Sequence, residues 1–475
     1  MIWKTAWKNV WRNKVRSLIV ISSVTVGIFA GVFSVALMNG LIAQRVNDAL
    51  NEEVSHIQIT NKDFRINNDP LLIIANFEET LSRIMSIEGI SGISERIVIT
   101  GMANTASKSS GVQILGIDPE KEKQVFTVNK KIMTGTGDYF ETESKFNLAL
   151  IGQELAKELN IIRYQVDTST FSRLRDKGVP EKIISKLTLL SGNKFANEKQ
   201  FIKEMKNVFS AGEAVKYGVL IRKEAWSFRE GARLTLTFLD SDNNLVGAVF
   251  RLAGLYDITN SMFEKSTVFV RSSDLNKLIG LGENDFHQLV VKISNIDQTD
   301  AVTDIIAQKL PDLEVMNWKK LQPDLAMMTG MVEQFYLIFG LIILAALAFG
   351  IINTMLMVVM ERTRELGMLT AIGMNKRKVF SMIMLESVFL SLIGGVTGMI
   401  ISYILISITS HTGIDLSQQA EGFEAFGYSA IVYPMISARF FVMVAVLIII
   451  TGVLSSIYPS MKALKLNPVE AIRSE

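Results

Sequence analysis

The stretch MERTRELGMLTAIGMNKRKVF, residues 360–380, is rich in Arg, Lys and Glu, yet it lies between two of the most apolar segments of the chain. Four long windows without Asp, Glu, Lys or Arg occur, at residues 17–44, 334–360, 387–414 and 440–461. Each window contains a run of about 20 or more mostly apolar residues, enough to cross a hydrocarbon core about 30 Å thick. The quoted stretch therefore connects two predicted membrane spans.

These windows predict an α-helical membrane protein with four transmembrane helices, at residues 17–43, 331–360, 379–409 and 438–459. The hydrophobic residues, 49% of 475, are concentrated in them. The first window is not typical of a cleaved signal peptide, because its apolar run is too long and no small-x-small cleavage site follows it. We interpret it as a retained anchor.

Residues 361–378 predict a short helix at the membrane surface. Leu366, Leu369 and Ile372 lie three residues apart, so they form a narrow apolar stripe on one helical face. Gly373 then interrupts the helix before the next span. The alternative is a plain connecting loop. The functional interpretation is a docking surface, since an apolar stripe flanked by charges can bind in a groove of a cytoplasmic partner.

Basic residues in the short connecting segments predict the orientation of the chain. Residues 1–16 hold five Lys and Arg and no acid, 361–378 hold five, and the tail at 460–475 holds three. The connection at 410–437 holds none. The positive-inside rule therefore places both termini and residues 361–378 in the cytoplasm, and the large segment at 44–330 and the loop at 410–437 outside.

Residues 1–16 predict an amphipathic helix on the cytoplasmic face. Trp3, Trp7 and Trp11 recur every four residues, and basic residues occupy the neighbouring stripe. This pattern is typical of a helix in the membrane interface, with indoles at headgroup depth and cations toward anionic lipid. The alternative is a simple helical extension of the first span.

The outer segment, 44–330, predicts an α+β domain. Strand-like runs occur at 56–60, 96–102, 111–117, 232–239, 248–256, 266–270 and 288–293, and helical patterns at 77–87 and 297–310. A segment at about 161–228 has a different residue pattern, which predicts three short helices inserted into this domain. Gly178 ends the first, Pro180 opens the second, and Asn197 with Gln200 forms a candidate capping box.

No catalytic or metal-binding pattern emerges from the sequence. His56, His287 and His411 are the only histidines, and none has ligand spacing to a carboxylate on one helical face. The chain has no cysteine, which excludes disulfides and thiolate metal sites, and its net charge of +2 does not favour nucleic acid as a partner. We expect no cofactor in this chain.

The segment ERTRELGMLTAIGMNKRKVFSMIMLESVFLSLIGGVTG, residues 361–398, resembles the signature of ABC transporter permeases of the MacB/FtsX type. The closing YPSMKALKLNPVEAIR, residues 458–473, resembles the C-terminal motif of that family. The layout of one span, a large outer domain and three further spans is similar as well. The resemblance implies a MacB-like periplasmic core domain between spans 1 and 2, in the bacterial inner membrane.

The resemblance further implies a dimer of permeases, with a second copy or a paralogue, driven by a pair of cytoplasmic ABC ATPase subunits that bind ATP and Mg²⁺. The sequence contains no G-x-x-x-x-G-K-[ST] phosphate-binding motif, so we expect the ATPase to be another chain, unlike in MacB itself. Residues 361–378 would be the coupling helix that transmits ATP-driven movement. The residues implied in ATPase coupling are Glu361, Arg364, Glu365, Leu366, Leu369, Ile372 and Gly373.

Residues 35–61, VALMNGLIAQRVNDALNEEVSHIQITN, look most like the lipoprotein-releasing permeases LolC and LolE. This narrower resemblance implies extraction of acylated lipoproteins from the outer leaflet of the inner membrane and transfer to a periplasmic carrier. The insertion at 161–228 departs from the usual pattern. Two alternatives stay open: a MacB-like efflux or export permease, and an FtsX-like regulator of a cell-wall hydrolase.

Several residues within the spans are candidates for function. Glu386 lies about two turns into the third span, where an ionisable group needs a partner or a wet cavity, and Lys376, Arg377 and Lys378 are the expected partners. Small-xxx-small spacings predict close helix packing at Gly27, Gly31, Gly394 and Gly398. The family resemblance implies a cavity for lipid or substrate lined by Phe29, Phe33, Met38, Phe335, Phe339 and Met355.

Overall fold

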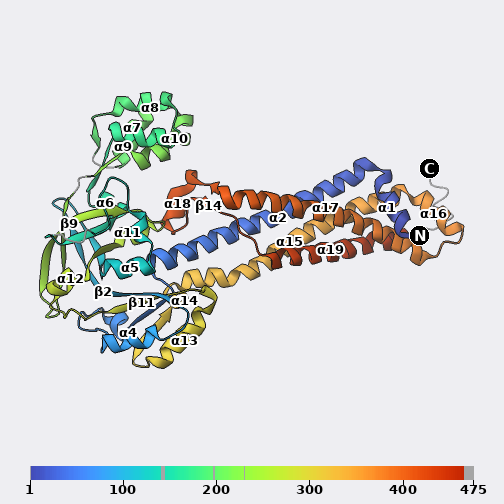
Figure 1. The fold of residues 1–475 in the computed structure, drawn as a ribbon. Helices are drawn as coiled ribbons and strands as arrows, with labels where there is room; N and C mark the ends of the chain where they lie inside the picture. The colour runs from blue at the N-terminus through green and yellow to red at the C-terminus, as the bar shows by residue number, and fades with distance from the viewer. Residues whose placement is uncertain (1, 141–144, 196–197, 229–230, 465–475) are drawn as a thin grey trace. The chain divides into compact units, whose positions relative to one another are not determined.

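The structure is a computed structural model that describes residues 2–140, 145–195, 198–228 and 231–464 (Figure 1). Two compact units result. The membrane unit comprises Met1–Ala43, Met327–Asp415 and Ile431–Glu475, and the outer unit comprises Gln44–Ala326 and Leu416–Ala430. Residues 465–475 of the expected tail, with Lys465 and Arg473, lie outside the described residues, as does Asn197 of the expected capping box.

Four helices of the membrane unit are long and apolar enough to cross a membrane, which agrees with the four predicted spans. The helices of this unit are α1 (Ile2–Arg12), α2 (Lys14–Asp48), α15 (Pro323–Glu361), α16 (Thr363–Ala371), α17 (Lys376–Thr412) and α19 (Ala438–Leu464). Most of them extend beyond the predicted spans, because polar residues next to the apolar windows continue the helix outside the hydrocarbon core. The short strands β13 (Ile414–Asp415) and β14 (Ile431–Val432) pair between α17 and α19.

Small residues bring α17 and α19 close together. Ser387, Ser391 and Gly395 of α17 are buried, as are Gly452 and Ser456 of α19. A Cβ added to Gly395 would lie 2.7 Å from Cγ2 of Ile448, so a larger residue there would force Ile448 or its helix to shift. Helices in a membrane are held by such close packing, since lipid offers no hydrophobic driving force between them.

The outer unit is built on a nine-stranded sheet, in the order β12-β1-β11-β2-β3-β10-β4-β9-β8. The strands are β1 (Ile57–Asn61), β2 (Ile90–Asn104), β3 (Ser109–Ile117), β4 (Leu148–Gly152), β8 (Arg233–Leu239), β9 (Leu245–Tyr256), β10 (Thr267–Arg271), β11 (Gln288–Ile293) and β12 (Leu313–Asn317). Strand β8 also pairs with β2, so β2, β3, β10, β4, β9 and β8 close into a ring. All pairs are antiparallel except β3 with β10 and β4 with β9.

Helices cover this sheet, and the predicted α+β domain between the first and second spans is confirmed. They are α3 (Phe64–Asn67), α4 (Phe77–Met85), α5 (Pro119–Val125), α6 (Gln153–Glu158), α11 (Ser261–Ser266), α12 (Ser272–Ile279), α13 (Thr299–Lys309) and α14 (Trp318–Leu321). Strands β4 and β12 were not expected. Both are five residues long, and β4 is buried on both faces, so it shows no alternation of apolar and polar residues.

The insertion at 161–228 differs from the expected three helices. It contains four, α7 (Thr168–Asp176), α8 (Glu181–Leu187), α9 (Glu198–Val208) and α10 (Ala211–Glu224), and a sheet in the order β6-β5-β7. The strands are β5 (Ile162–Gln165), β6 (Lys194–Phe195) and β7 (Trp226–Phe228). The fourth helix begins at a capping box between Ser210 and Glu213, and Pro180 is the N-cap of α8 rather than its first residue.

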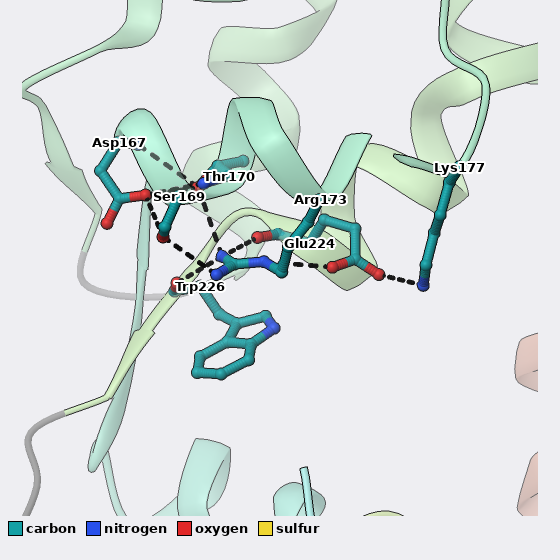
Figure 2. A network of polar contacts seen from close by, with 7 residues as sticks. All are labelled: Asp167, Ser169, Thr170, Arg173, Lys177, Glu224 and Trp226. Atoms are coloured by element: carbon teal, nitrogen blue, oxygen red, sulfur yellow. Dashed lines mark hydrogen bonds and ion pairs between the residues drawn. The ribbon is translucent and has the colours of Figure 1, made fainter. Parts of the chain in front are cut away.

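A buried acid fixes the end of α10 to α7 (Figure 2). Glu224 is paired with Nε of Arg173 at 3.2 Å and with Lys177, and Arg173 also donates to the Glu224 carbonyl at 2.7 Å. The Arg173 guanidinium lies 4.8 Å from the centre of the Trp226 ring. Charge pairing and cation–π contact therefore join α7, α10 and β7 around the insertion's own apolar core.

The middle of the predicted loop at 410–437 folds as part of the outer unit. It carries α18 (Ala420–Ala425), and Glu424 of this helix pairs with Lys223 of the insertion at 3.2 Å. Gly427 has a φ of +74° and packs against the Arg45 guanidinium. Arg45 in turn pairs with Glu53 at 2.7 Å, and both side chains are buried, so the final turns of α2 are fixed within the outer unit.

Candidate functional site

Helix α16 is the folded form of the polar stretch between the second and third spans. It runs from Thr363 to Ala371, shorter than the expected 361–378. It ends because Gly373 adopts a φ of +95°, a conformation that glycine accepts without steric cost. Asn375 is the N-cap of the next helix, α17, and its side chain accepts a hydrogen bond from the Arg377 amide.

The apolar residues of α16 divide between two roles, and the expected docking stripe is only partly available. Leu366 is 4% exposed and Leu369 is partly buried, and both pack against the core of the membrane unit. Ile372 is 86% exposed and Met368 is 46% exposed. The prediction that Leu366 and Leu369 belong to an exposed docking surface is wrong, because these side chains pack α16 against the bundle. Met368 and Ile372 form the exposed apolar surface.

A cluster of polar side chains anchors the start of α16. The side chain of Glu386 in α17 is 5% exposed and accepts hydrogen bonds from Nη1 of Arg362 at 3.2 and 3.3 Å. Nε of Arg362 also donates to Glu365 at 3.0 Å. Two residues of α1 complete the cluster: Asn9 donates to Glu386 at 2.6 Å, and Arg12 donates to Glu365 at 2.7 Å.

The partner of Glu386 is Arg362, not one of the basic residues at 376–378. Those three residues are exposed in the first turn of α17, more than two turns before Glu386 on the same helix. Arg362 lies in the turn between α15 and α16, and its guanidinium can reach both carboxylates from there. The hydrogen bond from Arg12 lowers the pKa of Glu365, so Glu365 stays ionised at neutral pH.

Of the other predicted coupling residues, Glu361 ends α15 and lines a polar cavity of about 280 Å³ next to Glu386. Arg364 is exposed on α16. The cavity is also lined by Asn9, Arg12, Arg362 and Glu365. A polar cavity of this size can hold water that solvates the charged cluster.

The four predicted packing glycines lie at close approaches of helices in this chain. A Cβ on Gly394 would lie 2.9 Å from the carbonyl of Ile21, and one on Gly398 would lie 2.8 Å from the carbonyl of Thr25. Gly27 faces Leu347 and Gly31 faces Ile343, both on α15. Helix α2 is therefore in glycine-mediated contact with α17 on one side and with α15 on another.

An apolar cavity of about 570 Å³ lies between α2 and α15. Three of the six predicted lining residues line it, namely Met38, Phe335 and Phe339. Phe29, Phe33 and Met355 do not: Met355 is buried in the core of the bundle, and the rings of Phe29 and Phe33 stack on each other at 5.8 Å. The prediction identified the two helices that line the cavity, but not which face of each helix borders it.

Two histidines have structural roles in the outer unit. Nδ1 of His287 accepts a hydrogen bond from the Val98 amide at 3.0 Å, and its ring stacks on Phe64 at 4.8 Å. His56 is buried, and burial lowers its pKa to about 4, so it is neutral at physiological pH. Within the described ranges, no group of three or more His, Asp and Glu is placed to hold a metal ion.

Residues 337–468 match the family model for the FtsX-like permease C-terminal domain. This part of the chain is an FtsX-like permease domain. It contains most of α15 and all described residues of α16, α17 and α19. The predicted resemblance to ABC transporter permeases of the MacB/FtsX type is thereby confirmed.

The relatives of this chain include ABC transporter permeases. An uncharacterised ABC transporter permease of Methanocaldococcus jannaschii is 26% identical over 235 residues, 48% of this chain and 55% of that protein. The pyoverdine export ATP-binding/permease protein PvdT of Pseudomonas entomophila is 34% identical over 154 residues, and the macrolide export ATP-binding/permease protein MacB of Chlorobium luteolum is 35% identical over 126. The last two matches span 32% and 26% of this chain but 20% and 16% of those proteins.

Among solved structures, the chain is similar to the extracellular domain of the transporter YknZ and to the periplasmic region of MacB from Actinobacillus actinomycetemcomitans. The sequence identities are 11% and 12%, and the TM-scores are 0.28 and 0.29. These matches cover 55% and 57% of this chain, and 98% and 92% of the solved chains. A specific similarity to LolC and LolE is not shown, and it stays a prediction.

The pairing of Glu386 can be tested through stability. Arg362→Met should destabilise the membrane unit by about 3–5 kcal/mol, because it leaves a buried carboxylate without its cation. Adding Glu386→Gln should recover most of this loss, since the neutral amide needs no counter-charge. The measurement is thermal unfolding of the detergent-solubilised chain. A double variant no more stable than Arg362→Met alone would show that the two residues do not depend on each other.

Proposed function

We propose that this chain is the permease subunit of an ABC transporter and that α16 is its coupling helix. The observation that carries the proposal is the division of α16 into a buried side, with Leu366 and Leu369, and an exposed apolar side, with Met368 and Ile372. The buried side fixes the helix to the bundle. The exposed side offers a cytoplasmic ATPase a surface on which to act.

The way in which α16 joins the bundle supports mechanical transmission. Arg362 and Glu386 fix its first turn to α17, so a push on Met368 and Ile372 moves the end of the bundle rather than a flexible loop. Helices α2 (to Asp48) and α15 (from Pro323) are continuous between the membrane unit and residues of the outer unit. In the proposed mechanism, ATP-driven closure at the cytoplasmic end moves the extracytoplasmic domain, and no substrate crosses the bilayer.

The partner subunits of the permease and its location are also part of the proposal. The ATPase, with its ATP and Mg²⁺, is a separate cytoplasmic subunit, and two permease chains form the transmembrane assembly. The bundle lies in the bacterial inner membrane with both termini inside, as the basic residues of its short cytoplasmic segments favour.

For the cargo, we propose acylated lipoproteins of the outer leaflet, which a periplasmic carrier then accepts. The cavity between α2 and α15 supports this choice, since its lining is almost entirely apolar and includes Met38, Phe335 and Phe339. A fatty acyl chain requires such a surface, and burying each CH₂ group contributes about 0.8 kcal/mol.

A MacB-like export permease is the second candidate. Relatives named as exporters of pyoverdine and macrolides favour it, since they match this chain at 34% identity over 154 residues and 35% over 126 residues. An apolar cavity suits many exported small molecules as well as acyl chains. An FtsX-like regulator, which moves no cargo, would not need the cavity.

The coupling surface can be tested with one exposed residue. Ile372→Asp should weaken binding of the ATPase subunit by about tenfold or more, because it places a charge in an apolar contact. Ile372→Met keeps the apolar surface and should retain near wild-type binding. The measurement is co-purification of the ATPase with the permease from membranes. Equal recovery of the ATPase with both variants and wild type would contradict a docking role for this surface.

The cargo can be tested by filling the cavity. Ala30→Phe adds a ring at a cavity-lining position, and Ile449→Phe adds bulk on the exposed surface of α19 as the control. We expect Ala30→Phe alone to abolish co-purification of acylated proteins, read by mass spectrometry, and to increase lipoprotein retention in the inner membrane. Unchanged retention, combined with altered drug susceptibility, would favour the export permease. If neither changes, the regulator is favoured.

A further inference from the structure

Helix α1 is built into the membrane unit. Its residues Ala6 and Val10 are fully or almost fully buried and belong to the bundle core. Ser17, at the start of α2, donates a hydrogen bond to the carbonyl of Val10. Only Asn13 separates the end of α1 from the start of α2, so a displacement of α1 must displace the beginning of the first span.

Aromatic contacts fix α1 to the third span. The rings of Trp3 and Trp7 lie 5.5 and 5.4 Å from the ring of Phe389 on α17, and the Trp7 contact is edge-on. Aromatic pairs in this range contribute about 0.5–1.5 kcal/mol each beyond burial of their area. The indoles remain partly exposed, which is compatible with the predicted position at headgroup depth, but one side of each packs on protein.

Polar contacts join α1 to the coupling helix itself. Asn9 donates to Glu386, which Arg362 also binds, and Arg12 donates to Glu365 in the first turn of α16. The resulting chain of side chains runs from Arg12 through Glu365, Arg362 and Glu386 to Asn9. It begins and ends on α1, and it connects α1 to both α16 and α17.

We infer that Asn9 and Arg12 are positioning residues that transmit movement of the coupling helix into the first span. The inference rests on the proposed function. The backbone connects α16 directly only to α15 and α17. Movement of α16 therefore reaches α2 through non-covalent contacts. Helix α1 supplies a path at the cytoplasmic end, because it contacts α16 and leads directly into α2. Since α2 and α15 form the apolar cavity, this path links closure of the ATPase to the shape of the cavity.

The test uses the complex isolated with its ATPase, in lipid nanodiscs. The chain has no native cysteine, so Ser34→Cys on α2 and Phe339→Cys on α15, both cavity-lining, introduce the only thiols of the permease. The readout is the rate of disulfide formation between them, with and without a non-hydrolysable ATP analogue. In this background the analogue should change the rate, because closure of the ATPase moves α2 relative to α15.

Arg12→Glu places two acids together and should reduce the analogue's effect on the cross-linking rate by about twofold to fivefold, the range for a partly exposed ion pair. Combining it with Asn9→Ala should reduce the effect further than Arg12→Glu alone, while ATP hydrolysis continues. Arg12→Lys should restore most of it. Lys8→Glu makes the same charge change at an exposed position of α1 and should have no effect.

The two ways of failing are distinct. If the analogue changes cross-linking equally in wild type, Arg12→Glu and the double variant, α1 does not transmit the movement, and the inference is wrong while the proposed function stands. If no ATPase co-purifies with the wild-type permease, or the analogue has no effect even without changes in α1, the proposed function fails and the inference fails with it. A reduction by Lys8→Glu as large as that by Arg12→Glu would also contradict the inference.

Discussion

The pairing of Arg362 with Glu386 is the constraint on which the end of the bundle that holds α1 and α16 depends. A carboxylate inside a helical bundle is costly unless a cation and hydrogen bonds satisfy it. Glu386 is satisfied by Arg362 and Asn9, which come from two other segments of the chain. The need to pair one acid therefore fixes three helices, α1, α16 and α17, in a defined arrangement. Arg362 also pairs with Glu365, so the same guanidinium orients the first turn of α16.

This arrangement suits α16 to the mechanical role proposed for it. An amphipathic helix held only by its apolar stripe could slide or rotate on the bundle, since apolar contacts are not directional. The ion pairs at its start add direction, and Gly373 allows the sharp turn into α17. Close glycine contacts hold α2 against α15 and α17. At its far end, α2 is fixed in the outer unit by the buried pair of Arg45 and Glu53.

Sequence reasoning was strongest where a single property decides the structure. Length and hydropathy sufficed for the four spans, and strand patterns located seven of the nine strands of the large sheet. Sequence reasoning failed where tertiary contacts decide which residues are buried or paired. The spacing of Leu366, Leu369 and Ile372 identifies a helical face but cannot say which residues of that face pack on the bundle. Glu386 was matched to nearby basic residues, whereas its partner is 24 positions away and brought close by a turn. The capping box of Ser210 and Glu213 was visible in the sequence and would have revealed the fourth helix of the insertion.

The central claim is that Ile372 and the rest of the exposed surface of α16 face the cytoplasm and contact an ATPase. Because the chain has no cysteine, Ile372→Cys can be labelled as a single thiol with a membrane-impermeant maleimide, and Leu245→Cys in the outer unit serves as the control. The account predicts that intact spheroplasts label Leu245→Cys only. In inside-out vesicles, Ile372→Cys should be labelled when the ATPase is absent and protected when the ATPase is bound. Labelling of Ile372→Cys in intact spheroplasts would place the helix on the opposite side of the membrane and contradict the account.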